Sequence, residues 1–314
     1  MKHEIHYGKA DVKVYRTHGA PLRGVTQIPE SAFSGRDNVL MGAEIEVTVR
    51  GDAFWDAYTV GDNRQVVATD TMKNFIQSAS LSCGSPTLEG WLHDIGRAFL
   101  DTYPQMESIT VSGRELPFPP ALVPGDEPGS FAMSEVLFSR ERCDASFASL
   151  DLVRGESEAS ERTRVADLES GRAGLQLVKI TGSSFADFAR DEHTTLPERP
   201  DRPLYIWCDI GWRYTQPMDA VGDDPARYVA GEQVVDLAVS VFHEFVSLSI
   251  QHLVHEIGQR MLVRWSQLSE VSFEAQNRLW DLAGESDEDR RVKVYADPRP
   301  PFGRIGLRLR RDVT

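Results

Sequence analysis

The sequence predicts an α+β fold of two tandem domains, each an antiparallel sheet with helices packed on one face. One observation is that segments in which apolar and polar residues alternate, the pattern of half-buried strands, occur in both halves of the 314-residue chain. The other is that apolar residues recur every three or four positions between these segments, as on one face of a helix. Each half therefore has the same order of two strands, a helical segment and two strands, although no residue-level repeat is apparent.

The first half contains two alternating segments, at residues 12–14 and 45–49, that are expected to form strands. Residues 17–39 lie between them, are rich in Gly, Pro and Ser, and are expected to form a long hairpin loop. The segment 64–75 is expected to be β-rich. Later strands are expected at residues 107–112, 133–139 and 146–153.

A helix is expected to begin at Ser85 and Pro86, because Ser is a favoured N-cap and Pro is tolerated in the first turn. It is expected to end near Tyr103 and Pro104. Its apolar face is formed by Leu88, Trp91, Leu92, Ile95 and Phe99.

Residues 154–166 are charged and poor in apolar side chains, so we expect a linker between a domain at 1–153 and a domain at 167–314. Strands are then expected at 175–177 and 204–212, and a helix start at Asp224-Pro225. Two helical faces follow, formed by Val234, Ala238, Val241, Phe242 and Phe245, and by Ile250, Leu253, Val254, Ile257 and Met261. The last expected strands are at residues 268–276, 291–296 and 304–310.

The composition limits the classes of partner and the compartment. The net charge of -14 argues against nucleic acid or an anionic membrane as partner, because no broad basic stripe offsets it. Cys83, Cys143 and Cys208 are far apart in sequence, which suits a reducing cytoplasm and gives neither a disulfide framework nor a zinc ribbon. The N-terminal residues contain no apolar run, so neither a signal peptide nor a membrane span is expected.

Two sets of residues could carry chemistry. Phe185 offers an aromatic face for stacking, and Arg202 offers a planar fork that can meet two acceptors on one edge of a ring. Lys9 could act as a base if its pKa is lowered, and the hydroxyl of Thr69 could relay a proton. On the residues alone, a core Phe, a salt-bridged Arg, a solvated Lys and a strand Thr are the commoner alternatives.

Three stretches resemble the urate oxidase (uricase) family, in family order. The first is Tyr7-Gly8-Lys9 followed by Asp11 to Tyr15, and the second is Val67 to Asn74, VATDTMKN. The third runs from Phe185 to Arg202 with the pattern F-x-x-F-x-R-D-E-x-T-T-L-x-E-x-x-D-R. The resemblance implies the tunnelling (T-) fold with two such domains per chain, in a homotetramer whose subunits join their strands into barrels. It also implies cofactor-independent oxidation of urate by O2 and water to 5-hydroxyisourate and hydrogen peroxide.

The resemblance also implies roles for individual residues. Lys9, Thr69 and Asn277 match the catalytic residues, with Asn277 holding dioxygen or water above the ring. In the family the Lys–Thr pair comes from one subunit and the ring-binding residues from its neighbour, so the active sites are expected at subunit interfaces. Residues matching the substrate-binding positions are Thr69, Asp70, Phe185, Leu196, Arg202, Ile250, Gln251 and Asn277.

One position departs from the family pattern. Many members continue Asn-Lys-His, and that His joins the proton relay, whereas this chain has Asn277-Arg278-Leu279. Leucine cannot carry a proton, so either the relay is shortened or another group or water replaces the His. A catalytically impaired purine-binding tetramer of the same fold is therefore an alternative. The C-terminal RDVT also lacks the peroxisomal tripeptide of many eukaryotic members, which suggests a bacterial, cytoplasmic protein.

No metal site is expected. His252 and His255 lie three apart on an expected helix, and His243 lacks the second His that a zinc-binding helix requires. This agrees with the resemblance, since the family uses no metal, flavin or haem. A metal-dependent pterin-type enzyme of the same fold is the second alternative, and it would require bound zinc. No Gly-rich phosphate loop follows a strand, so a nucleotide cofactor is not expected either.

Overall fold

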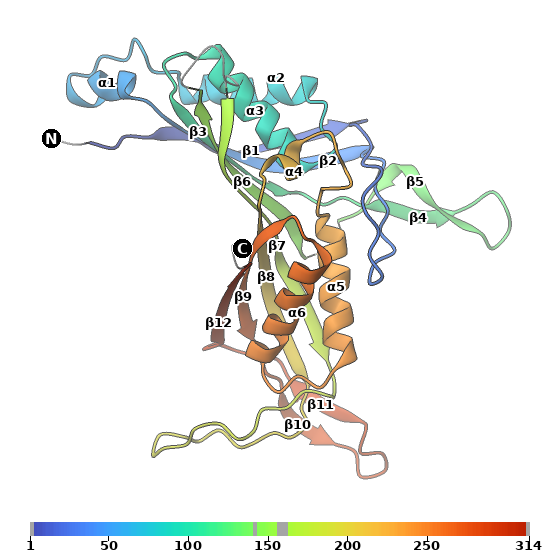
Figure 1. Ribbon diagram of the computed structural model, residues 1–314. Helices are drawn as coiled ribbons and strands as arrows, with labels where there is room; N and C mark the ends of the chain where they lie inside the picture. Colours follow the sequence, from blue (N-terminus) through green and yellow to red (C-terminus); the bar gives the residue numbers. More distant parts are fainter. Residues whose placement is uncertain (1–2, 141–142, 156–162, 312–314) are drawn as a thin grey trace. The chain divides into compact units, whose positions relative to one another are not determined.

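The computed structural model describes residues 3–140, 143–155 and 163–311 (Figure 1). The chain divides into two compact units. Unit 1 comprises Met1–Thr26, Ser34–Gly171 and Arg213–Val229, and unit 2 comprises Gln27–Phe33, Arg172–Trp212 and Ala230–Thr314. Eight strands are hydrogen-bonded in the order β1-β2-β3-β6-β7-β8-β9-β12. Of these, β7 (Thr163–Lys179) and β8 (Leu204–Tyr214) each contribute residues to both units.

Unit 1 is built on antiparallel strands covered by helices. The loop 17–39 joins the first two strands as expected, and the β1–β2, β2–β3 and β3–β6 pairs are all antiparallel. Helix α2 packs on β1, and α3 packs on β3 and β6. The elements are β1 (Tyr7–Thr17), β2 (Leu40–Arg50), a 3-10 turn (Asp52–Phe54), α1 (Trp55–Thr59), α2 (Thr69–Ser82), α3 (Leu88–Thr102), β3 (Ser108–Glu115), β4 (Pro120–Pro124), β5 (Phe131–Phe138), β6 (Ala145–Arg154) and α4 (Met218–Val221).

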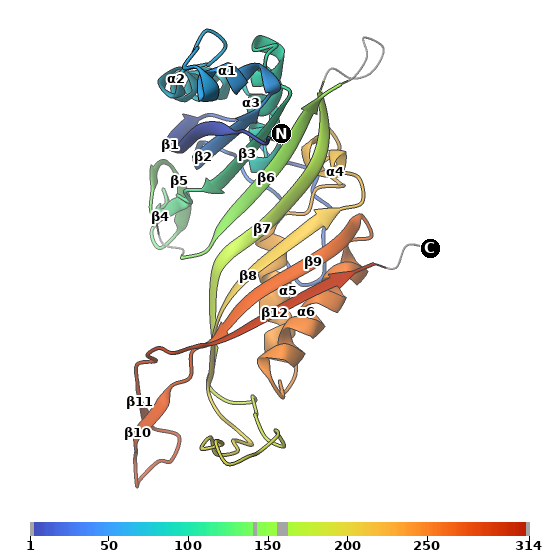
Figure 2. The ribbon, with the colours of Figure 1, turned by 90° about the vertical axis from the view of Figure 1, so that its left-hand side faces the viewer.

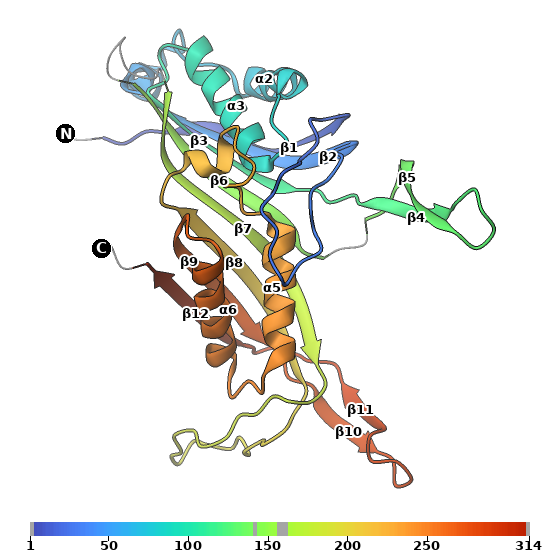
Figure 3. The same ribbon diagram turned by 45° about the vertical axis from the view of Figure 1, so that its right-hand side comes forward.

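Unit 2 repeats this plan. Helices α5 and α6 pack against each other and lie on one face of the strands, and α6 contacts β9 and β12 (Figure 3). Figure 2 shows the other face, with β8, β9 and β12 side by side. The elements are α5 (Gly231–Glu244), α6 (Ile250–Arg264), β9 (Leu268–Asn277), β10 (Asp281–Glu285), β11 (Lys293–Ala296) and β12 (Gly303–Arg310).

The core of unit 2 follows from the alternation that the sequence shows. The side chains of Ile206, Ile210 and Phe273 are at most 2% exposed, and Phe273 lies against Gly258 of α6. Gly258 lets α6 approach the sheet closely, because a Cβ there would lie 2.8 Å from a methyl carbon of Leu309. The expected α+β architecture is confirmed.

The helix α2 corrects one expectation. Residues 64–75 were expected to be β-rich, yet a helix starts at Thr69. Met72 and Ile76 are fully buried, and Ser80 is 2% exposed. Their spacing of four places all three on one helical face, and this burial outweighs the local β preference.

Two helix starts also differ from expectation. The N-cap of α3 is Thr87, whose Oγ1 accepts a hydrogen bond from the Gly90 N–H at 3.1 Å, so the helix starts two residues after Pro86. Asp224-Pro225 does not start a helix. The Arg227 N–H donates to Asp224 O in a turn, and α5 begins at Gly231.

The structure reveals a residue-level repeat that the sequence analysis missed. The stretch 87–103, TLEGWLHDIGRAFLDTY, and the stretch 249–265, SIQHLVHEIGQRMLVRW, each form a 15-residue helix between an N-cap hydroxyl and an aromatic C-cap. Each has Gly as its ninth helical residue, Gly96 or Gly258, in close approach to strand side chains. The two units therefore share one helix–sheet motif.

The expected domain boundary stays a prediction. Residues 156–162 of the expected linker lie outside the described residues, whereas residues 163–166 belong to β7. The hairpins β4–β5 and β10–β11 were not expected as pairs, because neither buries an alternating apolar face.

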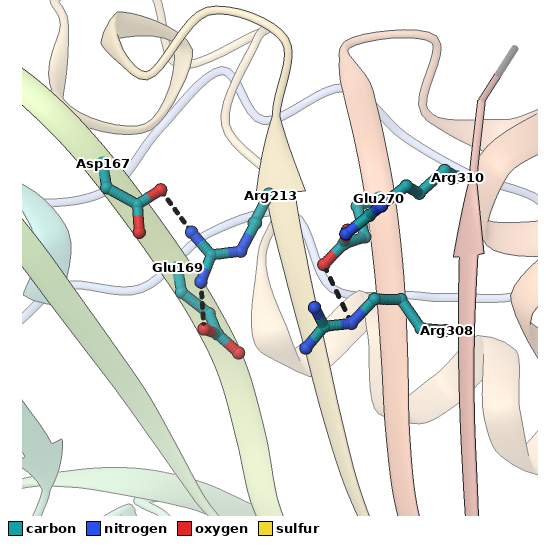
Figure 4. A network of polar contacts seen from close by, with 6 residues as sticks. All are labelled: Asp167, Glu169, Arg213, Glu270, Arg308 and Arg310. Carbon is teal, nitrogen blue, oxygen red and sulfur yellow. Dashed lines mark hydrogen bonds and ion pairs between the residues drawn. The ribbon is translucent and has the colours of Figure 1, made fainter.

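Charged side chains link neighbouring strands within each unit (Figure 4). In unit 1, Arg213 on β8 pairs with Asp167 and Glu169 on β7. In unit 2, Glu270 on β9 pairs with Arg308 at 3.3 Å and Arg310 at 2.6 Å on β12. These pairs hold adjacent strands in register by charge-assisted hydrogen bonds.

Candidate functional site

Unit 2 contains a cavity of about 370 Å³ at the end of its strands. It gathers residues from the loop 185–202, the start of α6, the end of β9 and the start of β12. All six residues that the sequence analysis assigned to ring binding in this half of the chain line it. The lining residues are Phe185, Leu196, Arg202, Ile250, Gln251, Asn277, Leu279, Asp281, Arg299, Pro301, Phe302, Gly303 and Ile305.

The loop 185–202 is folded so that its two ends meet. Phe185 and Arg199 exchange both backbone hydrogen bonds, at 2.8 and 2.9 Å, and the Arg202 N–H donates to Ser183 O at 2.9 Å. As a result, Phe185 and Arg202 come together although they are far apart in sequence. The guanidinium carbon of Arg202 lies 5.3 Å from the Phe185 ring centroid. On the Phe185 ring, Phe188 stacks with a centroid distance of 5.0 Å.

Arg202 is an unusual arginine because its side chain is buried and forms no ion pair among the described residues. It is 8% exposed, and its Nε has no hydrogen-bond partner among the described residues. Burial, with the nearby charge of Arg199, lowers the pKa of the Arg202 guanidinium. A guanidinium nevertheless stays charged at neutral pH. A buried donor without a partner costs stability, so the side chain is poised to bind a ligand that carries acceptors.

The start of α6 supplies an amide to the same cavity. Ser249 caps the helix, because its Oγ accepts a hydrogen bond from the His252 N–H at 3.1 Å. Ile250 follows, is 3% exposed, and anchors this end of the helix in the core. Gln251 is exposed at the cavity wall, where its carboxamide can both donate and accept.

Asn277 is the last residue of β9 and continues the helix-facing row of Phe273 and Ala275. Its Oδ1 is buried and has no hydrogen-bond partner among the described residues. Gly303 is its partner on β12. A Cβ placed on Gly303 would meet no described atom within 4 Å, so the space beside Asn277 is open. The cavity thus holds a second unsatisfied polar group, an acceptor this time.

Leu279 lines the cavity, so the departure from the family pattern falls within the site itself. Sequence analysis missed six further lining residues: Asp281, Arg299, Pro301, Phe302, Gly303 and Ile305. Four of them, Arg299, Pro301, Phe302 and Gly303, lie in the stretch 298–303, PRPPFG, whose Pro and Gly could have indicated an irregular segment between strands. These residue types do not indicate which side chains point into the cavity.

Lys9, Thr69 and Asp70 belong to unit 1. Tyr7 links their two segments, because its hydroxyl accepts a hydrogen bond from the Val67 N–H at 3.0 Å, just before α2. Burial raises the pKa of the Tyr7 hydroxyl. The hydrogen bond from Lys73 lowers the pKa of the Asp70 carboxyl, and the charge of Lys9 contributes to the same lowering. The YGK and TDTMKN motifs are therefore neighbours in the fold.

Lys9 lies where β1 departs from regular pairing. The register with β2 shifts between Lys9 and Val12, as at a β-bulge. Gly8 precedes it at a close approach, because a Cβ there would lie 1.8 Å from Val47 O. The YGK motif therefore needs its glycine for steric reasons.

Among the described residues, no three His, Cys, Asp or Glu side chains are grouped as a metal site would require. In the same part of the chain, no helix is both long and apolar enough to cross a membrane.

Comparison with known proteins gives close relatives. The family model for uricase matches residues 5–138 and 168–306. The uricase of Haloferax volcanii is 46% identical over 299 residues, which cover 95% of this chain and 96% of that protein. A uric acid degradation bifunctional protein of Bacillus sp. strain TB-90 is 46% identical over 299 residues, and the chain spans 59% of its length.

Solved structures show the same fold. The crystal structure of urate oxidase from Bacillus sp. TB-90 matches with a TM-score of 0.92 and 44% identity, covering 98% of this chain and 100% of that chain. A uricase from Bacillus fastidious matches with a TM-score of 0.93 and 42% identity, covering 99% and 94%. The resemblance carried by the three motifs is confirmed, and the chain belongs to the uricase family.

Proposed function

We propose that the protein is a urate oxidase that converts urate, O2 and water into 5-hydroxyisourate and hydrogen peroxide without a cofactor. The observation that carries this proposal is the pair of unsatisfied polar groups, Arg202 Nε and Asn277 Oδ1, in one cavity with Phe185 and Gln251. A planar, anionic ring rich in carbonyl and N–H groups complements such a set. The family membership of the chain supports the same substrate.

In the proposed complex, the urate anion lies over Phe185, and its carbonyl and ring nitrogens meet Arg202 and Gln251. Leu196 and Ile250 form apolar walls. Binding gives Arg202 Nε a hydrogen-bond partner, which it lacks among the described residues. A ligand without these groups would leave buried donors unsatisfied, so the site discriminates against it.

The proposed chemistry requires a base. Lys9 and Thr69 take a further proton from the urate anion, and the backbone N–H of Asp70 binds the purine beside Thr69. The electron-rich ring then passes two electrons to O2 held near Asn277, hydrogen peroxide leaves with two protons, and water adds to the oxidised ring. The protein supplies orientation and electrostatic preorganisation, and no metal, flavin or haem takes part.

The proposed assembly is a homotetramer with the active sites at subunit interfaces, where Lys9, Thr69 and Asp70 of one subunit meet the cavity of another. Complementation tests this proposal. Co-expressed K9M and R202A chains should form mixed oligomers in which some sites contain both native residues, so activity should reappear. Mixed oligomers as inactive as either parent would contradict shared sites.

The proposed location is the cytoplasm. The free thiols of Cys83 and Cys208 are both buried, and such unpaired thiols suit a reducing compartment.

The first experiment follows the ultraviolet absorbance of urate and the consumption of O2 on chelator-treated protein. We expect the two reactants to disappear in equal amounts. Leu279 in the cavity favours one alternative, a purine-binding protein with an impaired relay. That alternative predicts binding of urate without O2 consumption. Activity that the chelator abolishes and zinc restores would instead indicate the metal-dependent alternative.

A further inference from the structure

Next to Asn277, the side chain of Arg278 is held between two aromatic rings. Its guanidinium carbon lies 3.4 Å from the Trp207 ring centroid and 4.5 Å from the Phe302 ring centroid. Its Nε and Nη2 both donate to Gln276 Oε1, at 3.2 and 2.9 Å. A planar guanidinium can stack on two rings and still donate in its own plane, which an ammonium group cannot do.

This clamp joins β8 to the two segments that line the cavity at the end of β9 and the start of β12. Trp207 is on β8, Arg278 follows the last residue of β9, and Phe302 precedes the first residue of β12. The Arg278 N–H also donates to Tyr205 O at 2.9 Å, which extends the contact between β9 and β8 by one residue. The ends of the three strands are thus fixed to one another at the cavity.

The residues on either side of the clamp line the cavity. Asn277 and Leu279 flank Arg278, and Phe302 is itself a lining residue. The Oδ1 of Asn277 has no partner among the described residues, so the side chain depends on its backbone for its position. Arg278 holds the backbone next to Asn277 through its N–H bond to Tyr205 O and through its stack on Phe302, which is part of the cavity wall.

We propose that Arg278 is a positioning residue for the oxidation step: its stack between Trp207 and Phe302 fixes Asn277 and the adjoining cavity wall. This inference rests on the proposed function, since Asn277 matters here as the residue that holds dioxygen or water. Among the described residues, no hydrogen bond or ring contact joins Trp207, Arg278 or Phe302 to Phe185, Arg202 or Gln251. We therefore expect the clamp to act on the oxygen side of the site and not on the binding of the purine ring.

The test compares R278K with wild type and with R308K. In R278K, lysine keeps the positive charge but cannot form the planar stack. The control R308K makes the same substitution at Arg308 on β12, which forms an ion pair with Glu270 outside the cavity. We expect R278K to lower kcat about tenfold to a hundredfold and to raise the KM for O2, since a displacement of about 1 Å can cost a hundredfold. Urate affinity, measured by calorimetry without O2, should change less than about threefold. R308K should match wild type in all three quantities.

A double-mutant cycle shows whether the effect passes through Asn277. In an N277A background, R278K should cost little more, because the residue that it positions is gone. Full additivity of the two losses, or an R278K enzyme that behaves like R308K, would overturn the proposal. A loss of urate affinity as large as the loss of kcat would also overturn it.

A crystal structure of R278K keeps the inference separate from the proposed function. If wild-type protein neither binds nor oxidises urate, the proposed function fails. Asn277 and Phe302 should still be displaced, or take alternate conformers, in R278K and not in R308K. Unchanged positions of both residues in R278K would refute the clamp.

Discussion

Arg154 and Arg311 make equivalent contacts at the ends of two helices. Arg154 Nη2 donates to the carbonyls of Leu100, Tyr103 and Met106, at 2.5, 3.1 and 3.0 Å, after α3. Arg311 donates to the matching carbonyls after α6, those of Leu262, Trp265 and Leu268. Each arginine thus satisfies the carbonyls that a helix C-terminus leaves without partners.

We expect R154A to lower the free energy of unfolding by about 2 kcal/mol, because several buried carbonyls lose a charged donor. R311A should cost less, since Arg311 is more exposed than Arg154 and water can replace it. Urea denaturation followed by circular dichroism measures both. R64A is the control, because Arg64 is exposed and pairs only locally with Asp62. Equal stability of R154A and R64A would contradict a capping role.

The open space at Gly303 gives a second prediction. Gly303 does not have a positive φ, so alanine adds only a methyl group, which points into the space beside Asn277. We expect G303A to lower kcat/KM for urate oxidation about tenfold by reducing the room for dioxygen or water. G284A is the matched control, since a Cβ there also meets no described atom within 4 Å, and Gly284 lies on β10 outside the cavity. Equal activity of the two variants would show that this space is not used.

Arg202 is expected to determine the affinity of the protein for urate. R202A should weaken urate binding about a hundredfold, and R202K should recover little of it, because an ammonium group cannot meet two acceptors on one ring edge. Calorimetry in the absence of O2 measures binding alone. R199K serves as control, since Arg199 is an exposed neighbour whose loop contacts are made by its backbone. Unchanged affinity in R202A would remove this residue from the site.

The spacing of apolar residues was enough to predict most strands and helices, because an element that buries one face has apolar residues at regular intervals. It failed within the segment 64–75, which was expected to be β-rich, because the helix that starts at Thr69 has a buried face that includes Met72 and Ile76. The repeat HDIG at 93–96 and HEIG at 255–258 was readable in the sequence but was overlooked. It would have indicated that Gln251 sits in α6 where Glu89 sits in α3.

The six cavity residues of the second half were found through family motifs and not through physical pattern. The meeting of Phe185 and Arg202 depends on backbone pairing with Arg199 and Ser183, which no local period encodes. The proposed role of Arg278 could not be anticipated either, because its partner Trp207 is on β8 and its partner Phe302 lies just before β12. Such contacts follow from strand order, which only the fold supplies.

Lys9 is expected to act in proton transfer. K9M should lower kcat about a hundredfold or more, the usual contribution of a positioned base, while urate affinity changes less than about threefold. K13M is the control, since Lys13 is on the same strand and pairs with Glu44 at 3.4 Å. Anaerobic binding and steady-state turnover separate the two effects. An equal loss of affinity and kcat would assign Lys9 to binding and not to catalysis.

The burial of Glu89 in unit 1 leads us to expect that the free energy of unfolding depends on pH. Its side chain is 3% exposed, and its Oε2 accepts a hydrogen bond from the Tyr228 hydroxyl at 3.2 Å. Burial raises the pKa of the Glu89 carboxyl above its ordinary value of 4.5. The folded state therefore favours the protonated form. The stabilisation that the protonated Glu89 contributes is fully present below pH 4.5. It is lost as the pH rises through the raised pKa of Glu89 in the folded protein.

The substitution E89Q should remove this loss of stability, because glutamine stays neutral at every pH. Glutamine also fits this position of the helix, since Gln251 occupies the equivalent position of α6. We expect E89Q to be more stable than wild type at pH 7 and equally stable below pH 4.5. Chemical denaturation across this range measures the difference. E135Q, at an exposed position on β5, should follow the wild-type curve at every pH. A stability gain in E89Q that persists unchanged below pH 4.5 would mean that it comes from packing and not from the buried charge.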